Sequence, residues 1–189
     1  MRRLFLFLLV VFAGSSLAYA QGPSGEFRLY YQTIRDFNYR TGLPDFEFQG
    51  DSFHGGGFGF VYDLNPRLGI YSDTAFLRGP EAGGIKLNLI NQVQGIKLTA
   101  RELGPLNVYA KGGIGFARYI FSASGSDLGV YWQSNFDLAG GVDFEINDGF
   151  YFYIEAKRMV MSLPRLTNVE DRDKWNGSLG LATGIAFRF

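Results

Sequence analysis

The last fifteen residues of this chain, residues 175–189, alternate between two kinds of side chain. Every second residue from Trp175 to Phe189 belongs to a mostly apolar and aromatic set, and the residues between them are small or polar. Because a β-strand points successive side chains to opposite faces, this pattern predicts a strand with one apolar face. The apolar face carries no charge and the other face is too small-sided for a hydrophobic core. We therefore expect the apolar face to point outward, into lipid.

The same two-residue period runs through most of the chain after Gln21 and predicts eight strands with little helix. The strands are expected at about residues 26–35, 52–64, 67–78, 85–100, 106–121, 130–146, 150–160 and 175–189. The fourth strand is irregular, because Leu87 and Leu89 alternate in one phase and Ile96 and Leu98 in the other. A one-residue slip flips every later side chain, so we expect a bulge or loop near residues 91–95.

The connections between these strands are expected to alternate in length. Tight turns are predicted after the second, fourth and sixth strands, and Asp148-Gly149 is typical of a hairpin turn. Longer connections are predicted after the odd-numbered strands, at residues 36–51, 79–84, 122–129 and 162–174. Short turns at one end, longer loops at the other and an even strand count are typical of bacterial outer-membrane barrels.

Charged residues of both signs fall on the strand faces opposite the apolar ones. The acids are Asp63, Asp73, Asp137, Asp143, Glu145 and Glu155, and the bases are Arg28, Lys97, Arg101, Lys111, Lys157 and Arg188. A dry core could not hold so many unpaired charges. Eight strands close around an interior that side chains can just fill. The prediction is an all-β, eight-stranded, antiparallel up-and-down transmembrane β-barrel with a lumen charge network; the alternative is a soluble sandwich or barrel whose charged face meets bulk water.

Residues 1–20 predict a cleaved secretory signal peptide, with Arg2 and Arg3 before a short apolar run and Ala18-Tyr19-Ala20 as the cleavage site. The barrel domain is expected at residues 21–189.

The composition of the chain limits the chemistry that it can perform. The chain has no cysteine and a single histidine, so no thiolate or histidine-rich metal site is available, and its formal net charge of zero predicts no nucleic-acid partner. No cofactor, metal or catalytic site is expected.

The positions of two tryptophans indicate where the outer of the two membrane–water interfaces lies. Trp132 and Trp175 both fall on the lipid-facing side near the outer ends of their strands. Aromatic rings of this kind collect at the interfaces of membrane proteins.

The signal peptide, the eight strands and the C-terminal run from Thr183 to Phe189 resemble small bacterial outer-membrane β-barrels, in particular the transmembrane domain of outer-membrane protein A and its small relatives. The resemblance implies the outer membrane of a Gram-negative-type bacterium, with outer-membrane lipid and lipopolysaccharide as partners. It also implies insertion by the barrel-assembly machinery, which would recognise Ile185, Phe187 and Phe189. Because the sequence stops at Phe189, we expect no periplasmic peptidoglycan-binding domain.

The function predicted from the sequence is that of a monomeric, non-enzymatic barrel that supports envelope integrity or makes surface contacts through its outer loops. One alternative is a lipid A acyl hydrolase or acyltransferase that uses Ser52 and His54, which share a strand face, with Asp51 or Glu47 as the acid. The other alternative is a narrow, low-conductance pore.

Overall fold

The fold is seen in a computed structural model, which describes residues 24–39, 47–103, 105–123, 126–164 and 174–189, and the backbone only of residues 100–103. The predicted signal peptide lies outside the described residues. The elements are β1 (Gly25–Tyr39), β2 (Phe48–Asn65), β3 (Leu68–Ala82), β4 (Ile85–Leu103), β5 (Leu106–Ala123), β6 (Ser126–Asn147), β7 (Phe150–Ser162) and β8 (Trp175–Arg188). Among the described residues, no helix is long or apolar enough to cross a membrane.

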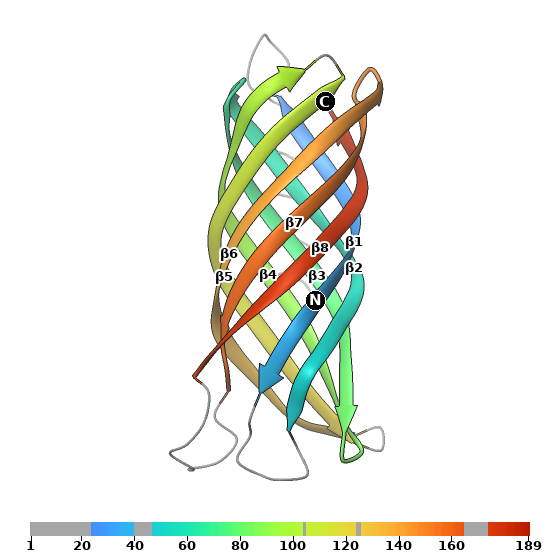
Figure 1. Ribbon diagram of the computed structural model, residues 1–189, viewed down its shortest axis with the longest axis vertical. Coiled ribbons are helices and arrows are strands. Elements are labelled where there is room, and N and C mark those ends of the chain that lie inside the picture. The colour runs from blue at the N-terminus through green and yellow to red at the C-terminus, as the bar shows by residue number, and fades with distance from the viewer. Residues whose placement is uncertain (1–23, 40–46, 104, 124–125, 165–173) are drawn as a thin grey trace, which may run out of the picture.

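The eight strands form one closed ring in sequence order, each antiparallel to its neighbours (Figure 1). β8 closes the ring by pairing with β1, from Glu26 opposite Arg188 to Arg35 opposite Leu179. Following paired residues once round the wall from Leu68 returns to β3 at Arg78, ten residues further along. Such a stagger requires strands that are tilted against the barrel axis. The predicted up-and-down barrel is confirmed.

The predicted interruption of the fourth strand is wrong. β4 pairs with β5 without a shift from Ile85 to Thr99, and residues 91–95 lie inside this unbroken ladder. Leu87 and Leu89 point into the barrel, whereas Ile96 and Leu98 point out of it. The apolar residues of β4 therefore change from the inward to the outward face because the interior is apolar at one end of the barrel and ionic at the other. The backbone pairing itself does not slip.

The predicted lengths of the outer connections are partly wrong. β3 and β4 are joined through Gly83 and Gly84 alone, both at positive φ, where glycine is favoured. β5 ends only two residues before β6 begins, at Ala123 and Ser126. Longer connections follow only β1 and β7, and the strands extend into the segments predicted to be loops. By the usual topology of these barrels, the end with the longer connections is the outer end and the opposite end is the inner end.

The barrel wall is apolar on its outside and the interior divides into two halves. Exposed residues on the outer surface include Leu29, Phe58, Ile70, Ile114 and Leu138, which is 67% exposed. A surface of this kind is unfavourable in water and suits acyl chains. Inside, the half near the inner end holds charged residues, and the half near the outer end holds large apolar ones.

Candidate functional site

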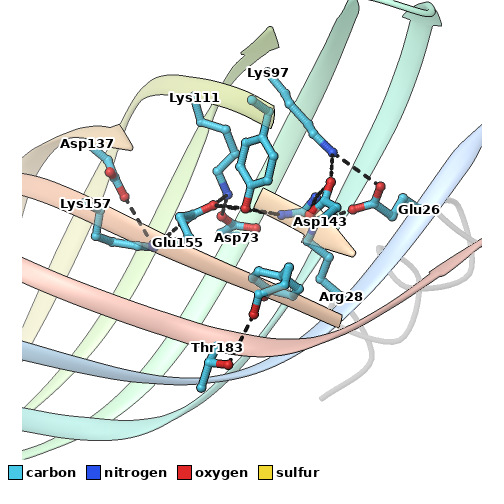
Figure 2. A network of polar contacts seen from close by, with 12 residues as sticks. Glu26, Arg28, Asp73, Lys97, Lys111, Asp137, Asp143, Glu155, Lys157 and Thr183 are labelled. Carbon is cyan, nitrogen blue, oxygen red and sulfur yellow. Dashed lines mark hydrogen bonds and ion pairs between the residues drawn. The ribbon is translucent and has the colours of Figure 1, made fainter. Parts of the chain in front are cut away.

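The inner half of the barrel is filled by one continuous set of ion pairs, which we call the ion-pair network (Figure 2). Its ten members are Glu26, Arg28, Asp73, Lys97, Lys111, Asp137, Asp143, Glu155, Lys157 and Arg188. Five are acids and five are bases, so the network as a whole is neutral. All strands except β2 contribute to it.

Arg28 lies at the centre of the network and is fully buried. Its Nε donates to Glu26, and its terminal nitrogen donates to both carboxylate oxygens of Asp143 at 3.1 Å. A further donation, to the Tyr109 hydroxyl, spans 3.0 Å. The guanidinium also lies over two rings, 4.9 Å from the centroid of Tyr109 and 4.5 Å from that of Tyr153.

Three lysines extend the network. Lys97 Nζ lies 3.1 Å from Asp143 and 3.4 Å from Glu26. Lys111 bridges Asp73 at 2.6 Å and Glu155 at 2.8 Å. Lys157 reaches Glu155 at 3.0 Å and Asp137 at 3.7 Å, as Figure 2 shows. Because each buried charge has an opposite partner, the interior avoids the large cost of an isolated ion.

β2 contributes no charged residue to the network, but its glycines leave room for the side chains of neighbouring strands. An ideal Cβ on Gly59 would lie 2.0 Å from Asp73 Oδ1, and one on Gly57 would lie 2.5 Å from the Tyr30 ring. The inward face of β2 must therefore be bare at both positions for Asp73 and Tyr30 to lie where they do.

The outer half of the interior is filled by apolar side chains, most of them large, which we call the apolar plug. Its members are Ile34, Phe37, Tyr39, Phe48, Phe53, Leu77, Leu87, Leu89, Ala117, Tyr119, Phe121, Met159, Met161 and Leu163. The rings of Phe37 and Phe53 meet edge to face with centroids 4.8 Å apart. The sequence predicts the charged residues of the lumen and does not predict this plug.

A short polar layer joins the plug to the network. Asn135 donates to Asn91, and the amides of Gln32 and Asn91 lie 3.7 Å and 3.8 Å from the sulfur of Met159. Ions and plug are therefore separated by neutral amides.

The structure brings together nine of the twelve charged residues predicted to face the lumen. Asp63 lies outside the network, near the inner end, and accepts a hydrogen bond from Ser24 at 2.8 Å. Glu145 is half-buried and forms no ion pair with another described residue. The side chain of Arg101 lies outside the described residues. Glu26 was missed, although it shares the inward face of its strand with Arg28 and is buried.

Ser52 and His54 lie exposed on the outside of β2. His54 is paired with Thr33 on β1 and Arg78 on β3. No hydrogen bond joins Ser52 to His54 among the described residues. Glu47, one of the acids considered, accepts a hydrogen bond from Gln49 at 2.9 Å. The strand brings the serine and histidine to one face, and no carboxylate among the described residues completes a triad with them.

The residues considered for assembly lie along the outward face of β8. Phe187 and Phe189 are exposed, and the ring of Phe187 packs on that of Phe150 with centroids 5.0 Å apart. Phe189 and Gly25 exchange two backbone hydrogen bonds, of 2.8 Å and 2.9 Å, which join the two ends of the barrel domain.

The outer wall also carries four arginines near the outer end, on alternate strands. We call Arg35, Arg78, Arg118 and Arg158 the arginine collar. With the stagger of the barrel taken into account, the first three lie at nearly one height along the axis. The backbone of Arg158 lies nearer the middle of the barrel wall. Its guanidinium occupies the space beside Gly177, where an added Cβ would lie 2.6 Å from a terminal nitrogen of Arg158.

Both tryptophans lie on the outside of the barrel near this collar. Trp132 is exposed, and the guanidinium of Arg118 lies over its ring, with Arg118 Cζ 5.5 Å from the ring centroid. Trp175 is exposed and packs on Phe136, with ring centroids 5.9 Å apart.

Comparison with known proteins supports the fold and nothing finer. No protein-family model matches the sequence, and no curated protein matches it. Among solved structures, Neisserial surface protein A is similar over 87% of this chain and 97% of its own, with a TM-score of 0.70 and 11% identity. OprG of Pseudomonas aeruginosa is similar over 89% and 96%, with a TM-score of 0.57 and 12% identity. Ail of Yersinia pestis is similar over 89% and 100%, with a TM-score of 0.52 and 16% identity.

The predicted class, a small bacterial outer-membrane β-barrel like the transmembrane domain of outer-membrane protein A, is confirmed at the level of the fold. The outer-membrane location predicted from the sequence agrees with this class of fold.

Proposed function

We propose that this protein is a closed outer-membrane barrel that does not conduct ions and serves as a rigid base for a cell-surface contact. The observation that carries this proposal is the filled interior. A solute entering from the outside meets the apolar plug, and beyond it the ion-pair network crosses the barrel. Eight-stranded barrels have interiors that side chains can fill completely.

The same observation weighs against the pore considered from the sequence. An ion crossing the plug would lose its water among apolar side chains, which costs much free energy. Passage through the inner half would require several buried ion pairs to separate at once. Conduction therefore needs a rearrangement of both halves.

The outer rim supports a role in surface contact, because the strands that bear the two longer connections are joined there. Tyr39 at the end of β1 donates to the carbonyl of Pro164, after β7, at 2.8 Å. Asn176 at the start of β8 donates to the carbonyl of Asn38 at 2.8 Å. The bases of the connections after β1 and β7 are thus fixed to one another, so both can contribute to one contact surface.

Two partners follow for the wall of the barrel. We expect the arginine collar to meet the phosphates of the outer leaflet, which makes lipopolysaccharide the expected lipid partner. The half-buried Ile185 and the exposed Phe187 and Phe189 share one outward face, which we expect the barrel-assembly machinery to recognise during insertion.

Planar-bilayer recording tests the proposal. Purified, folded protein is expected to give no steady conductance. Heat-modifiable migration of the same reconstituted sample on a detergent gel separates a silent, folded barrel from protein that failed to fold. Large steady openings of the unaltered protein would overturn the proposal.

A further inference from the structure

Four uncharged polar side chains interrupt the apolar outer wall on two neighbouring strands. We call them the polar patch: Ser72 and Thr74 on β3, and Gln92 and Gln94 on β4. Ser72 is paired with Gln94 and Thr74 with Gln92, so the four form one compact group. They face outward, because the residues that alternate with them, such as Asp73 and Val93, are buried inside the barrel.

The polar patch lies at the middle of the apolar wall. With the stagger taken into account, it is level with Leu138 on β6 and Leu181 on β8, both of which are exposed to the surroundings. A position at this depth meets acyl chains, far from the phosphates that the arginine collar reaches. A lipid headgroup therefore cannot be its partner.

None of the four side chains forms a hydrogen bond with another described residue. Acyl chains offer neither donors nor acceptors, so an amide exposed to them is left unsatisfied at a cost in free energy. Thr183 shows the contrast. It also lies on the lipid side of the wall, but its hydroxyl donates to the carbonyl of Tyr153 at 3.2 Å.

We infer that the polar patch is the surface through which two copies of this chain associate side by side in the membrane. An amide carries both donors and an acceptor, so a patch of two glutamines is complementary to itself. Two copies inserted in the same direction hold their patches at the same depth. A two-fold axis along the membrane normal then brings each patch onto its equivalent.

The wall beside the patch permits close approach. Gly56 on β2 and Gly112 on β5 flank it and face outward; a Cβ at Gly56 would have no neighbour nearer than 3.7 Å, and one at Gly112 none nearer than 3.8 Å. Small residues allow backbones of membrane segments to come close together. The proposed dimer differs from the monomer expected from the sequence.

Disulfide trapping tests the inferred surface in isolated outer membranes. The chain has no cysteine, so Ser72→Cys introduces a single thiol and leaves both glutamines in place. The matched control is Leu181→Cys, at the same depth on the opposite side of the ring. Oxidation with copper–phenanthroline is expected to cross-link Ser72→Cys into a homodimer and to leave Leu181→Cys monomeric. Equal cross-linking of the two variants, or none of either, would overturn the inference.

Energy transfer between donor- and acceptor-labelled copies in lipid vesicles supplies an independent measurement. The double variant Gln92→Leu/Gln94→Leu is expected to weaken dimerisation roughly tenfold, which corresponds to the loss of about two hydrogen bonds between membrane-embedded side chains. The control Thr183→Val removes a hydroxyl that is already satisfied and should leave dimerisation unchanged. Heat-modifiable migration on a detergent gel verifies that each variant is folded. A wild-type protein that stays monomeric, or a dimer indifferent to the loss of both glutamines, would contradict the inference.

Discussion

Replacing Arg28 by methionine removes the central cation of the ion-pair network while keeping a side chain of similar length. Glu26 and Asp143 each lose a close partner, and Tyr109 and Tyr153 lose a cation over their rings. Breaking a buried ion pair by removing one partner costs about 3–5 kcal/mol, because the remaining charge is left uncompensated. Lys97 still reaches both acids, at 3.4 Å and 3.1 Å, so we expect a loss near the lower end, about 3 kcal/mol.

The assay is equilibrium unfolding by urea of the protein refolded into phospholipid vesicles. Trp132 and Trp175 both face the lipid, so their fluorescence reports loss of the membrane-embedded state. Heat-modifiable migration gives an independent measure of the folded fraction. A linear extrapolation with unchanged slope gives the free energy of unfolding for each variant.

Two variants make this prediction specific. Lys86→Met breaks the exposed 3.6 Å pair with Glu81 and should change stability by less than about 1 kcal/mol. Combining Arg28→Met with Glu26→Gln removes one acid along with the base and should regain part of the lost stability. An Arg28→Met loss as small as that of Lys86→Met would refute the reasoning, since it would mean that water replaces the guanidinium at little cost.

Three further changes test other parts of the molecule. Gly59→Ala should destabilise the barrel by about 1–3 kcal/mol in the same unfolding assay, because the new methyl group collides with Asp73. His54→Ala should leave the acylation state of lipid A unchanged by mass spectrometry, because no described carboxylate contacts this histidine. Arg35→Ser and Arg158→Ser should each reduce the lipopolysaccharide retained by the detergent-solubilised protein about fivefold, since a basic residue near an anionic membrane surface contributes about 1 kcal/mol.

Matched controls accompany these changes. Gly140→Ala places a methyl group where the nearest atom is 3.8 Å away and should be nearly neutral. Arg67→Ser removes an exposed arginine at the inner turn between β2 and β3, far from the collar, and should not alter the retained lipopolysaccharide. Equal losses from Arg67→Ser and the collar variants would show that the collar has no special role. A lipid A species that disappears with His54→Ala would restore the enzyme hypothesis.

The barrel could be predicted from the sequence because one observation, the two-residue period, determines which side chains face inward. The parity of Arg28, Lys111 and Glu155 places all three inside whatever the register. The same parity places Glu26 inside, and it was overlooked because it begins its strand. The expected loop at residues 79–84 contains Gly83-Gly84, and consecutive glycines between two alternating segments are typical of a tight hairpin turn.

The environment inside the barrel could not be predicted from parity alone. Leu87 and Leu89 are out of phase with Ile96 and Leu98, and parity does not reveal that these leucines fill an apolar half of the interior. The partners within the network were also beyond prediction. Arg28 and Asp143 are 115 residues apart, and only the register of the intervening strands brings them together. The position of a residue along its strand determines whether it faces inward, but the strand register determines which residues it contacts.

The equal number of acids and bases in the ion-pair network has a consequence for the response of this barrel to voltage. A potential across a membrane acts on each buried charge with about 2.3 kcal/mol per elementary charge per 100 mV. Forces on five positive and five negative groups held in one rigid cluster nearly cancel. A Donnan potential between the periplasm and the medium thus has almost no net charge in this network on which to act.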